Sequence, residues 1–477
     1  ADRVRTALRN TGYPLPPKRI TVNLAPASIR KEGSRFDLAV AAAVLGAMEK
    51  IPAGNLDGLM IVGELSLSGQ VLGVSGVLAL VEKAKKLGLR RCIVPAVNAR
   101  EGAVFRDMEV VGVSKLKELI EILQHPEQAG KTVVDVDALF SEQAVESEGQ
   151  EDFAQIYGQA EVKRAAEIAA AGMHNFLMIG PPGSGKTMIA RRIPGILPRL
   201  SLEESLEITK IYSIAGQLPE RETLLLKRPF RSPHHTTTAE ALAGGGRIPG
   251  PGEVSLSSKG ILFLDELPEF RRTALEILRQ PLEEKRICIS RTAGTYTFPA
   301  DFMLVAAMNP CACGYYPDRN RCCCAQRDVI RYLGKLSQPL LDRIDICANV
   351  SPVGFDALQQ TGKEESTAEI RTRVEQAHEI QRERYRGLKA RFNAQLGAGD
   401  TEKYCGLGKK EKELLGDAFD ALNLSARAYH RIVRVARTIA DLEEKEQIEV
   451  LLKSKVHDEG QIPATSRERI HYLLAYS

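Results

Sequence analysis

A glycine-rich stretch carries the strongest chemical signal in the chain. It consists of Gly180, Pro181, Pro182, Gly183, Ser184, Gly185, Lys186 and Thr187 and fits the pattern G-x-x-x-x-G-K-[ST]. Glycines let a backbone wrap closely, so that successive N–H groups point at phosphate oxygens. Lys186 would reach the β- and γ-phosphates, and the Thr187 hydroxyl would hold Mg²⁺. The pattern predicts a site for ATP and its magnesium ion.

A second motif follows about eighty residues later, in GILFLDELPEF (260–270). Its continuous apolar run is typical of a buried parallel strand, and the strand ends in Asp265 and Glu266. Asp265 would hold Mg²⁺ through water, and Glu266 would polarise the water that attacks the γ-phosphate. An apolar run ending in Asp-Glu is weak evidence alone, but downstream of a phosphate-binding loop it predicts hydrolysis of the nucleotide.

The flanking sequence predicts the strands and the helix that position these residues. Apolar residues 176–179 predict a strand before the loop, and MIARRI (188–193) predicts a helix after it. A third strand, FMLVAAMN (302–309), ends in Asn309. These elements predict an α/β core over 153–355, built as a parallel sheet with helices on both faces.

The remaining chain divides by composition. Residues 1–125 mix predicted strands with predicted helices, which indicates a separate α/β domain. The strands are expected at 19–26, 59–67 and 91–97, and the helices at 36–49, 75–88 and 114–124. Polar, acidic residues 126–152 are interpreted as a linker. Periodic helices at 366–391, 409–422 and 423–442 predict an all-α lid over 356–477.

Composition limits the class of protein. Of the 477 residues, 44% are hydrophobic and 26% charged, as in ordinary soluble proteins. The formal charge of +4 is too small to indicate a nucleic-acid partner by itself. Nine cysteines without a secretory signal favour a reducing cytoplasm, and no apolar run is long enough to cross a bilayer. We therefore expect a cytoplasmic protein with no membrane partner.

The order of the motifs resembles that of AAA+ ATPases. In that family, residues in the positions of Ile156 and Tyr157 pack against adenine, and a residue like Asn309 (sensor 1) helps to position the water. Arg343, in LLDRIDI (340–346), would reach the γ-phosphate bound by a neighbouring subunit. Arg427 would be sensor 2 of the lid. A core-facing helix start is the alternative for Ile156 and Tyr157. A helix-cap or turn residue is the alternative for Asn309, and a surface ion pair is the alternative for Arg343.

The lid helix continues the basic pattern beyond Arg427. Arg431, Arg434 and Arg437 follow it at spacings of 4, 3 and 3 and so share one helix face. This basic stripe would be solvated or would line a path for phosphates.

Two segments of the first domain, 31–41 and 67–88, resemble the proteolytic domain of Lon-type proteases. The position of the serine nucleophile is occupied by Arg35, and the position of the lysine base by Leu80. Neither side chain can do that chemistry. The resemblance therefore implies an inactive Lon-like domain that serves as a scaffold or a ring-forming collar. We also expect this domain to be shortened at its N-terminus.

Three further segments, 228–246, 251–270 and 278–284, are similar to the magnesium-chelatase-like AAA+ family, in particular to its bacterial ComM/YifB members. The resemblance covers almost the whole chain. It implies a hexameric ATPase that moves branched DNA and drives branch migration, a helicase activity, in homologous recombination and natural transformation (competence). Recombination proteins would be further partners.

The same resemblance implies two insertions, at 236–258 and at 287–302. In the second, ICIS and TYTF alternate around TAGT, which predicts a β-hairpin. Hairpins of this kind line the central pore of ring ATPases. Arg247, Lys259 and Arg291 would then contact DNA phosphates without regard to base sequence, although surface basic residues are commonly just solvated.

A cluster of cysteines lies between Asn309 and Arg343. Cys311, Cys313, Cys322 and Cys324 form two C-x-C pairs around a turn, with Cys323 spare, and four thiolates suit one Zn²⁺. An iron–sulfur cluster and unliganded reduced thiols are the alternatives. The adjacent pair at 234–235 is interpreted as structural, because neighbouring histidines rarely bind one metal together.

The sequence is also compatible with two other functions. A protein remodeller would thread polypeptide through the pore, and Tyr296 and Phe298 would offer aromatic contacts there, although no aromatic–Gly pore loop is present. A chelatase subunit would drive insertion of Mg²⁺ into a porphyrin, with a separate porphyrin-binding partner.

Overall fold

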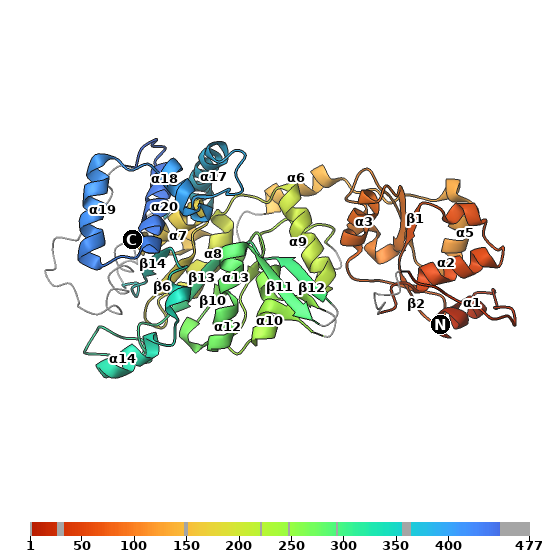
Figure 1. Ribbon diagram of the computed structural model, residues 1–477, viewed down its shortest axis with the longest axis horizontal. Coiled ribbons are helices and arrows are strands. Elements are labelled where there is room, and N and C mark those ends of the chain that lie inside the picture. Colours follow the sequence, from red (N-terminus) through yellow and green to blue (C-terminus); the bar gives the residue numbers. More distant parts are fainter. Residues whose placement is uncertain are drawn as a thin grey trace. The chain divides into compact units, whose positions relative to one another are not determined.

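The computed structural model describes residues 2–25, 33–146, 151–219, 222–246, 249–291, 294–354 and 364–448 (Figure 1). The chain forms two compact units. One comprises residues 1–147 together with 201–226, and the other comprises residues 148–200 together with 227–477. None of the described helices is long and apolar enough to cross a membrane.

The larger unit contains a five-stranded sheet in the order β14-β6-β13-β10-β7, and all of its strand pairs are parallel. The strands are β6 (Phe176–Ile179), β7 (Phe230–Arg231), β10 (Ile261–Leu264), β13 (Met303–Met308) and β14 (Ile346–Asn349). The carboxyl ends of parallel strands share one edge of a sheet, and ligands bind there. The phosphate-binding loop, Asp265 and Asn309 all follow strands of this sheet.

Helices cover both faces of this sheet, because its strands are apolar on both sides. Phe176 and Met178 point into one core, and Leu177 and Ile179 point into the other. The first face is covered by α7 (Ala160–Gly172), α8 (Lys186–Ile196) and α17 (Thr367–Arg384), and the second by α12 (Arg272–Ile277), α13 (Arg279–Glu284), α14 (Gln326–Leu333) and α15 (Gln338–Leu341). The predicted α/β core with a parallel sheet is confirmed.

The end of the described chain is helical, as predicted for a lid. Its helices are α17, α18 (Ala398–Tyr404), α19 (Lys409–Leu422) and α20 (Ala426–Leu442). Residues 355–363 and 449–477 of the predicted lid lie outside the described residues.

Three arginines of the basic stripe of α20 form hydrogen bonds within the protein. Arg431 donates to the carbonyl oxygen of Ile344 at 2.7 Å, and Arg434 donates to that of Leu396 at 2.9 Å. Arg437 is buried and paired with Asp441. These three guanidinium groups therefore bond α20 to its neighbours, Arg437 from a buried position and Arg431 and Arg434 from half-buried ones.

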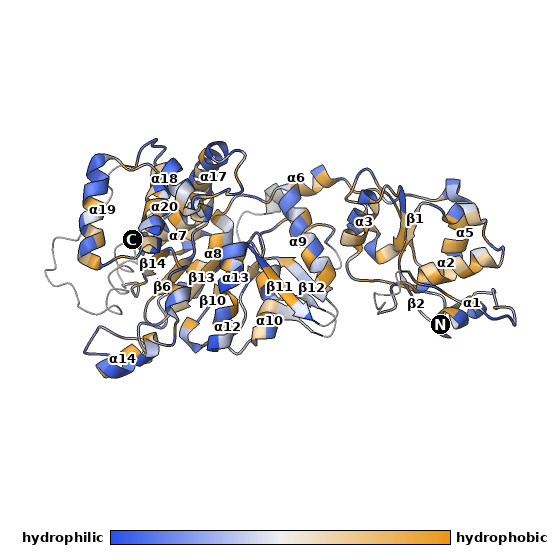
Figure 2. Ribbon diagram, viewed as in Figure 1, coloured by the Kyte–Doolittle hydropathy of each residue, from blue (hydrophilic) through white to orange (hydrophobic). Residues whose placement is uncertain are grey.

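The smaller unit is built on a parallel sheet of β1 (Leu59–Ile61), β4 (Arg91–Pro95) and β5 (Glu109–Val113). A short pair, β2 (Glu64–Leu65) and β3 (Val71–Leu72), lies beside α1 (Asp2–Asn10) and α2 (Asp37–Ala47). This unit also contains the helices α3 (Val77–Lys86), α4 (Ala99–Gly102) and α5 (Leu116–Gln124). Helix α2 is apolar along most of its length (Figure 2) and packs into a core with α1 and α5. Leu80 of α3, in the place of a protease lysine, packs against the second apolar core of the unit.

Two strand predictions in this unit need correction. Among residues 19–25 no strand forms, and the side chains of Ile20 and Val22 are exposed, because no described strand pairs with this segment. The predicted strand 59–67 breaks into β1 and β2. At the break, the Gly63 N–H donates to the Arg35 carbonyl at 2.9 Å and the Gly63 carbonyl accepts the Leu38 N–H at 3.1 Å, so this backbone bonds to the start of α2 instead of to a strand.

The structure also places two segments differently from the predicted domain boundaries. Within the expected linker 126–152, Val136–Glu146 forms α6, and Val136 is buried with Leu139 and Phe140 packed beside it. Helix α9 (Leu202–Ala215), expected in the ATPase core, belongs to the smaller unit. There it packs on α3, and Ser213 accepts the backbone N–H of Gly76 at 3.0 Å.

Candidate functional site

The glycine-rich loop connects β6 to α8 at the carboxyl edge of the large sheet. The ammonium group of Lys186 donates to the carbonyl oxygens of Gly180 and Pro181, each at 2.8 Å, and lies 3.3 Å from the Asn309 side-chain oxygen. Burial lowers the pKa of Lys186, and the charge of Asp265 opposes that shift. The lysine is therefore held between its own loop and the residue after β13, at the carboxyl edge of the sheet.

Gly180 shows why this loop requires its glycine. A Cβ at this position would lie 2.2 Å from the carbonyl oxygen of Val350, the residue after β14. The backbone of the loop thus passes so close to the neighbouring strand end that no side chain fits. Beyond the loop, α8 begins at Lys186, and the N-terminus of a helix favours negative charge.

The oxygens predicted to hold magnesium lie together. The Thr187 hydroxyl donates to the Asp265 carboxylate at 2.8 Å, and that carboxylate also accepts the N–H of Glu266 at 2.9 Å. A hydroxyl beside a carboxylate at the end of a phosphate loop is the hard-oxygen set that Mg²⁺ prefers. The residues present fit a nucleotide with a bound Mg²⁺ ion. The ion would neutralise part of the phosphate charge. Lys186 and the loop N–H groups would bind and orient the phosphates, and Glu266 would hold a proton of the attacking water.

The segment before α7 is tied both to the loop and to the start of the lid. Gln159 donates to the carbonyl oxygens of Ser184 and Ser351 at 2.8 and 3.0 Å. The N–H of Gly158 donates to Glu364 at 2.9 Å. Of the two predicted adenine contacts, Ile156 is buried in the core and Tyr157 is exposed. Only Tyr157 therefore has a free surface to offer to a base.

Arg343, expected to reach a neighbouring γ-phosphate, and Arg427, expected to be sensor 2, both contact Glu283. Arg343 forms an ion pair with Glu283 of α13 and donates to the carbonyl oxygen of Pro339, so that only 10% of its side chain is exposed. Arg427, at the start of α20, lies 3.9 Å from the same Glu283 oxygen. Both guanidinium groups thus converge on one exposed carboxylate.

His235 was not recognised as a site residue from the sequence. Its Nδ1 lies 3.1 Å from Oε2 of Glu266, and its ring packs beside His234 and against the edge of Phe270. His235 follows β7, which pairs directly with the Asp265 strand. Its place just beyond a strand at the carboxyl edge of the sheet was the signal that could have identified it.

The predicted hairpin is present as β11 (Arg286–Arg291) and β12 (Gly294–Pro299), paired antiparallel. The first insertion forms α10 (Ala239–Ala243), the short pair β8 (Gly244–Gly245) and β9 (Gly250–Pro251), and α11 (Glu253–Leu256). The two insertions touch each other, since Arg291 lies 3.7 Å from Glu240 of α10.

The three basic residues predicted to bind DNA have different surroundings. Arg291 is 41% exposed at the end of β11. Lys259 is only 14% exposed and pairs with Asp301 at 2.9 Å. Its charge is satisfied inside the protein, which corrects the prediction that it meets phosphates. Arg247 lies outside the described residues.

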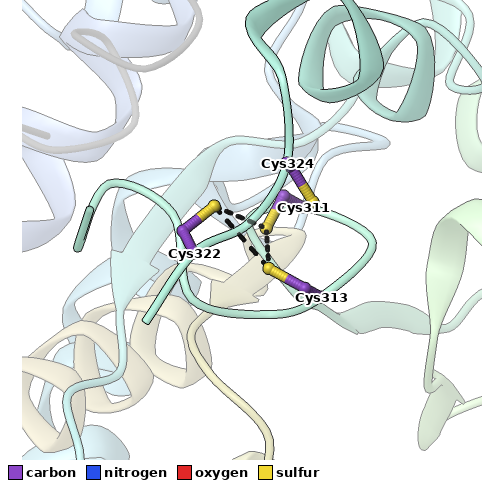
Figure 3. A group of neighbouring side chains, drawn as sticks. All are labelled: Cys311, Cys313, Cys322 and Cys324. Carbon is purple, nitrogen blue, oxygen red and sulfur yellow. Dashed lines mark hydrogen bonds between the residues drawn. The ribbon is translucent and has the colours of Figure 1, made fainter. Parts of the chain in front are cut away.

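The cysteine loop brings four thiols to one point (Figure 3). The sulfurs of Cys311, Cys313, Cys322 and Cys324 lie within 4.8 Å of one another. Cys311 is 3.3 Å from Cys313 and 3.8 Å from Cys322, while Cys313 is 3.6 Å from Cys322. None of them forms a disulfide. Hydrogen bonds from backbone N–H groups and neighbouring thiols lower the pKa of Cys313 to about 6.

Family models match most of the chain. A model described as magnesium chelatase, subunit ChlI, matches residues 152–358, and its C-terminal model matches residues 364–451. A third, described as subunit ChlI of Mg-chelatase, matches residues 1–98.

Two individual relatives align with nearly all of the sequence, and a third aligns with a part of it. Competence protein ComM of Haemophilus influenzae is 43% identical over 450 residues, which are 94% of this chain and 86% of the relative. YifB of Escherichia coli is 41% identical over 474 residues, 98% of this chain and 90% of the relative. Lon protease 2 of Bacillus subtilis is 31% identical over 129 residues, 26% of this chain and 22% of the protease. The chain therefore belongs to the ComM/YifB family of magnesium-chelatase-like AAA+ ATPases, with a Lon-like N-terminal region.

Proposed function

We propose that this chain is a hexameric, ATP-driven DNA motor that performs branch migration in homologous recombination and natural transformation. The observation that carries the proposal is the pair of touching insertions beside the ATP site. The first lies between His235 and Asp265, and the second leads directly into the strand that ends in Asn309. A relative named Competence protein ComM, 43% identical, supports a role in competence.

The chemistry of the second hairpin suits a nucleic-acid strand. Arg291 offers a partly exposed guanidinium for phosphates, and Tyr296 of β12 is 37% exposed and offers an aromatic face for base stacking. Such contacts are independent of base sequence and weaken with salt. A motor that moves along any DNA needs contacts of this kind.

Assembly into a ring is supported by the arginines on Glu283. Arg343 and Arg427 lie on that carboxylate, and the described contacts do not join either one to Lys186 of the same chain. A second copy, presenting its phosphates to this edge, would offer both guanidinium groups an anion in exchange for Glu283.

The decisive experiment is a DNA-dependent ATPase assay with a synthetic forked duplex and a four-way junction. We expect DNA to accelerate hydrolysis and junction migration to require ATP. Lys186→Ala should abolish both activities, and higher salt should remove the stimulation.

The alternative functions predict different outcomes in the same assay. Stimulation by an unfolded protein, with none by DNA, would identify a polypeptide remodeller. ATPase activity indifferent to both, with porphyrin metallation once a partner subunit is added, would identify a chelatase subunit. Either result would overturn the DNA motor.

We also propose that the cysteine cluster binds one structural Zn²⁺. Tetrahedral coordination at about 2.3 Å places thiolate sulfurs about 3.8 Å apart, and the three measured separations run from 3.3 to 3.8 Å. The loop also touches the ATP site. A Cβ on Gly314 would lie 2.5 Å from Pro182 of the phosphate-binding loop. A metal that holds the cysteine loop in place would also hold Gly314 against Pro182, and so would stabilise the phosphate-binding loop.

Metal analysis of protein purified without added metal tests this site. We expect about one zinc per chain, and we expect Cys311→Ser to lose it and to unfold at lower temperature. Cys323→Ser is the matched control, because Cys323 is exposed and lies outside the cluster, so its zinc content should stay unchanged. Iron in place of zinc, or metal-free protein with full ATPase activity, would contradict the proposal.

A further inference from the structure

Arg343 is carried by a short connection, residues 342–345, between α15 and β14. The backbone of this connection is bonded on two sides. Asn175, the residue before β6, donates from its side chain to the Arg343 carbonyl oxygen at 2.7 Å. On the other side, Arg431 of α20 donates to the Ile344 carbonyl oxygen at 2.7 Å. The connection is therefore tied both to the sheet and to the lid.

Arg431 provides the tie to the lid. Its Nη1 also lies 3.4 Å from the carbonyl oxygen of Leu341, the last residue of α15, where a helix leaves carbonyl groups without partners. A guanidinium presents several N–H donors in one plane, so it can bond two carbonyl oxygens at once. The contacts of Arg431 thus lie on both sides of Arg343 in the sequence.

Two more side chains of α20 contact the same region. Arg434 lies 3.8 Å from the carboxylate of Asp345, at the end of the connection. Arg427, in the first turn of the helix, contacts Glu283, the carboxylate that also pairs with Arg343. Successive turns of one helix therefore lie along the backbone and the side chain of Arg343.

The guanidinium of Arg343 can change its partner, but its reach starts from this backbone. It now lies on Glu283, and its buried Nε has no hydrogen-bond partner among the described residues, so Glu283 does not satisfy the whole group. We infer that Arg431 is a positioning residue: by bonding residues 342–345 to α20, it sets the point from which Arg343 reaches the γ-phosphate of a neighbouring subunit. This inference rests on the proposed ring. Movement of the lid in one subunit would then carry Arg343 toward or away from the nucleotide of the next.

The test measures ATP hydrolysis and ATP binding by full-length variants, without DNA. A misplacement of about 1 Å at a catalytic group can cost about 100-fold in rate, so we expect Arg431→Ala to lower kcat by about 10- to 100-fold. The phosphate loop of the variant is intact, so its affinity for a fluorescent ATP analogue should stay within about twofold of the wild-type value. A kcat equal to that of the wild type would overturn the inference.

Two other substitutions separate the hydrogen bonds of Arg431 from its packing. Arg431→Met keeps a long apolar stem without a donor, and it should lose as much activity as Arg431→Ala even where the alanine variant is less stable. Arg431→Lys keeps the charge and N–H donors, so it should recover most of the lost rate. Recovery by methionine and not by lysine would mean that the stem only packs, which contradicts a positioning role.

Arg371→Ala is the matched control. Arg371 is also a half-buried arginine of the lid that donates to a backbone carbonyl, that of Gly195 at 2.6 Å. Its bond joins α17 to α8 instead of α20 to residues 342–345, so kcat should stay close to wild type. An equal loss in this control would show that any loosening of the lid slows hydrolysis, and the assignment to Arg431 would fail.

A double variant tests whether Arg431 acts through Arg343. In single-turnover assays with protein in excess, the chain that carries both Arg343→Ala and Arg431→Ala should hydrolyse ATP as slowly as Arg343→Ala alone, because no guanidinium is left to position. Losses that multiply in the double variant would place the effect of Arg431 elsewhere and would overturn the inference.

Mixed subunits distinguish this inference from the ring on which it rests. Arg431→Ala chains should regain activity with Lys186→Ala chains, whose arginines are intact, and should gain none with Arg343→Ala chains. If neither mixture recovers while the double variant still equals Arg343→Ala, the arginine acts within its own chain: the ring site is then wrong and the positioning by Arg431 stands. If Arg343→Ala hydrolyses ATP at the wild-type rate, both fail. A wild-type chain that is indifferent to DNA would remove the DNA motor and leave the positioning to be judged on the same rates.

Discussion

Glu266→Gln is expected to bind ATP as tightly as the wild-type chain and to hydrolyse it about 10²- to 10⁴-fold more slowly, the range usual for loss of a general base. The carboxylate follows β10 directly, and Asp265 stays free to pair with Thr187. The amide keeps the shape of the side chain but cannot take a proton from water. Nucleotide affinity is measured with a fluorescent ATP analogue, and turnover by phosphate release.

Glu269→Gln is the matched control for this variant. Glu269 lies three residues further along the same loop, is exposed, and forms an ion pair with Lys335 at 2.8 Å. Loss of that surface pair should leave turnover close to wild type. A Glu266→Gln chain that hydrolyses ATP at more than a tenth of the normal rate would mean that another group activates the water.

Arg343→Ala is expected to lose turnover by about 10³-fold or more while retaining ATP binding, as is typical when an arginine that stabilises the transition state is removed. The guanidinium is held mainly by Glu283 and by the carbonyl oxygen of Pro339. Removing it therefore leaves the phosphate loop of the same chain intact. Arg279→Ala is the control, since Arg279 lies on α13, the helix of Glu283, and forms a local pair with Glu276 at 3.0 Å.

Mixing subunits tests whether Arg343 acts across an interface. Arg343→Ala chains have intact phosphate loops, and Lys186→Ala chains have intact arginines. In mixed rings, some interfaces combine both intact groups and should recover part of the hydrolysis that each variant lacks alone. Mixtures as inactive as their components would argue for an arginine that acts within its own chain.

The sequence predicts the parts of the site that depend on local pattern. The phosphate loop, the Asp265–Glu266 pair and the β11–β12 hairpin each consist of contiguous residues with a strict spacing, and the structure has a loop, a strand end and a hairpin at these positions. The residues of a contiguous motif determine the local backbone conformation, so the motif can be recognised without knowledge of distant contacts.

The features that the sequence did not predict depend on distant partners. Nothing near Arg343 or Arg427 indicates that both meet Glu283, and the spacing of the α20 arginines describes one helix face without saying what covers it. Likewise, the acidic composition of 126–152 led to the prediction of a linker, although Val136, Leu139 and Phe140 lie on the apolar face of α6. In each case a tertiary contact outweighed the local signal.

Because α9 belongs to the smaller unit, the two units cannot be separated by truncating the chain at a single residue. The polypeptide passes from the larger unit into the smaller one at residue 201 and returns after residue 226. Truncation at residue 147 would strip the smaller unit of a helix whose Ser213 bonds the buried Glu101 and whose Lys210 pairs with Glu82. Glu101 would keep the Leu78 N–H and the Asn98 amide as donors, but Leu78 would lose the apolar contact with Leu206 of α9. Deletion analysis of the N-terminal region therefore requires a graft that carries residues 201–226 along with it.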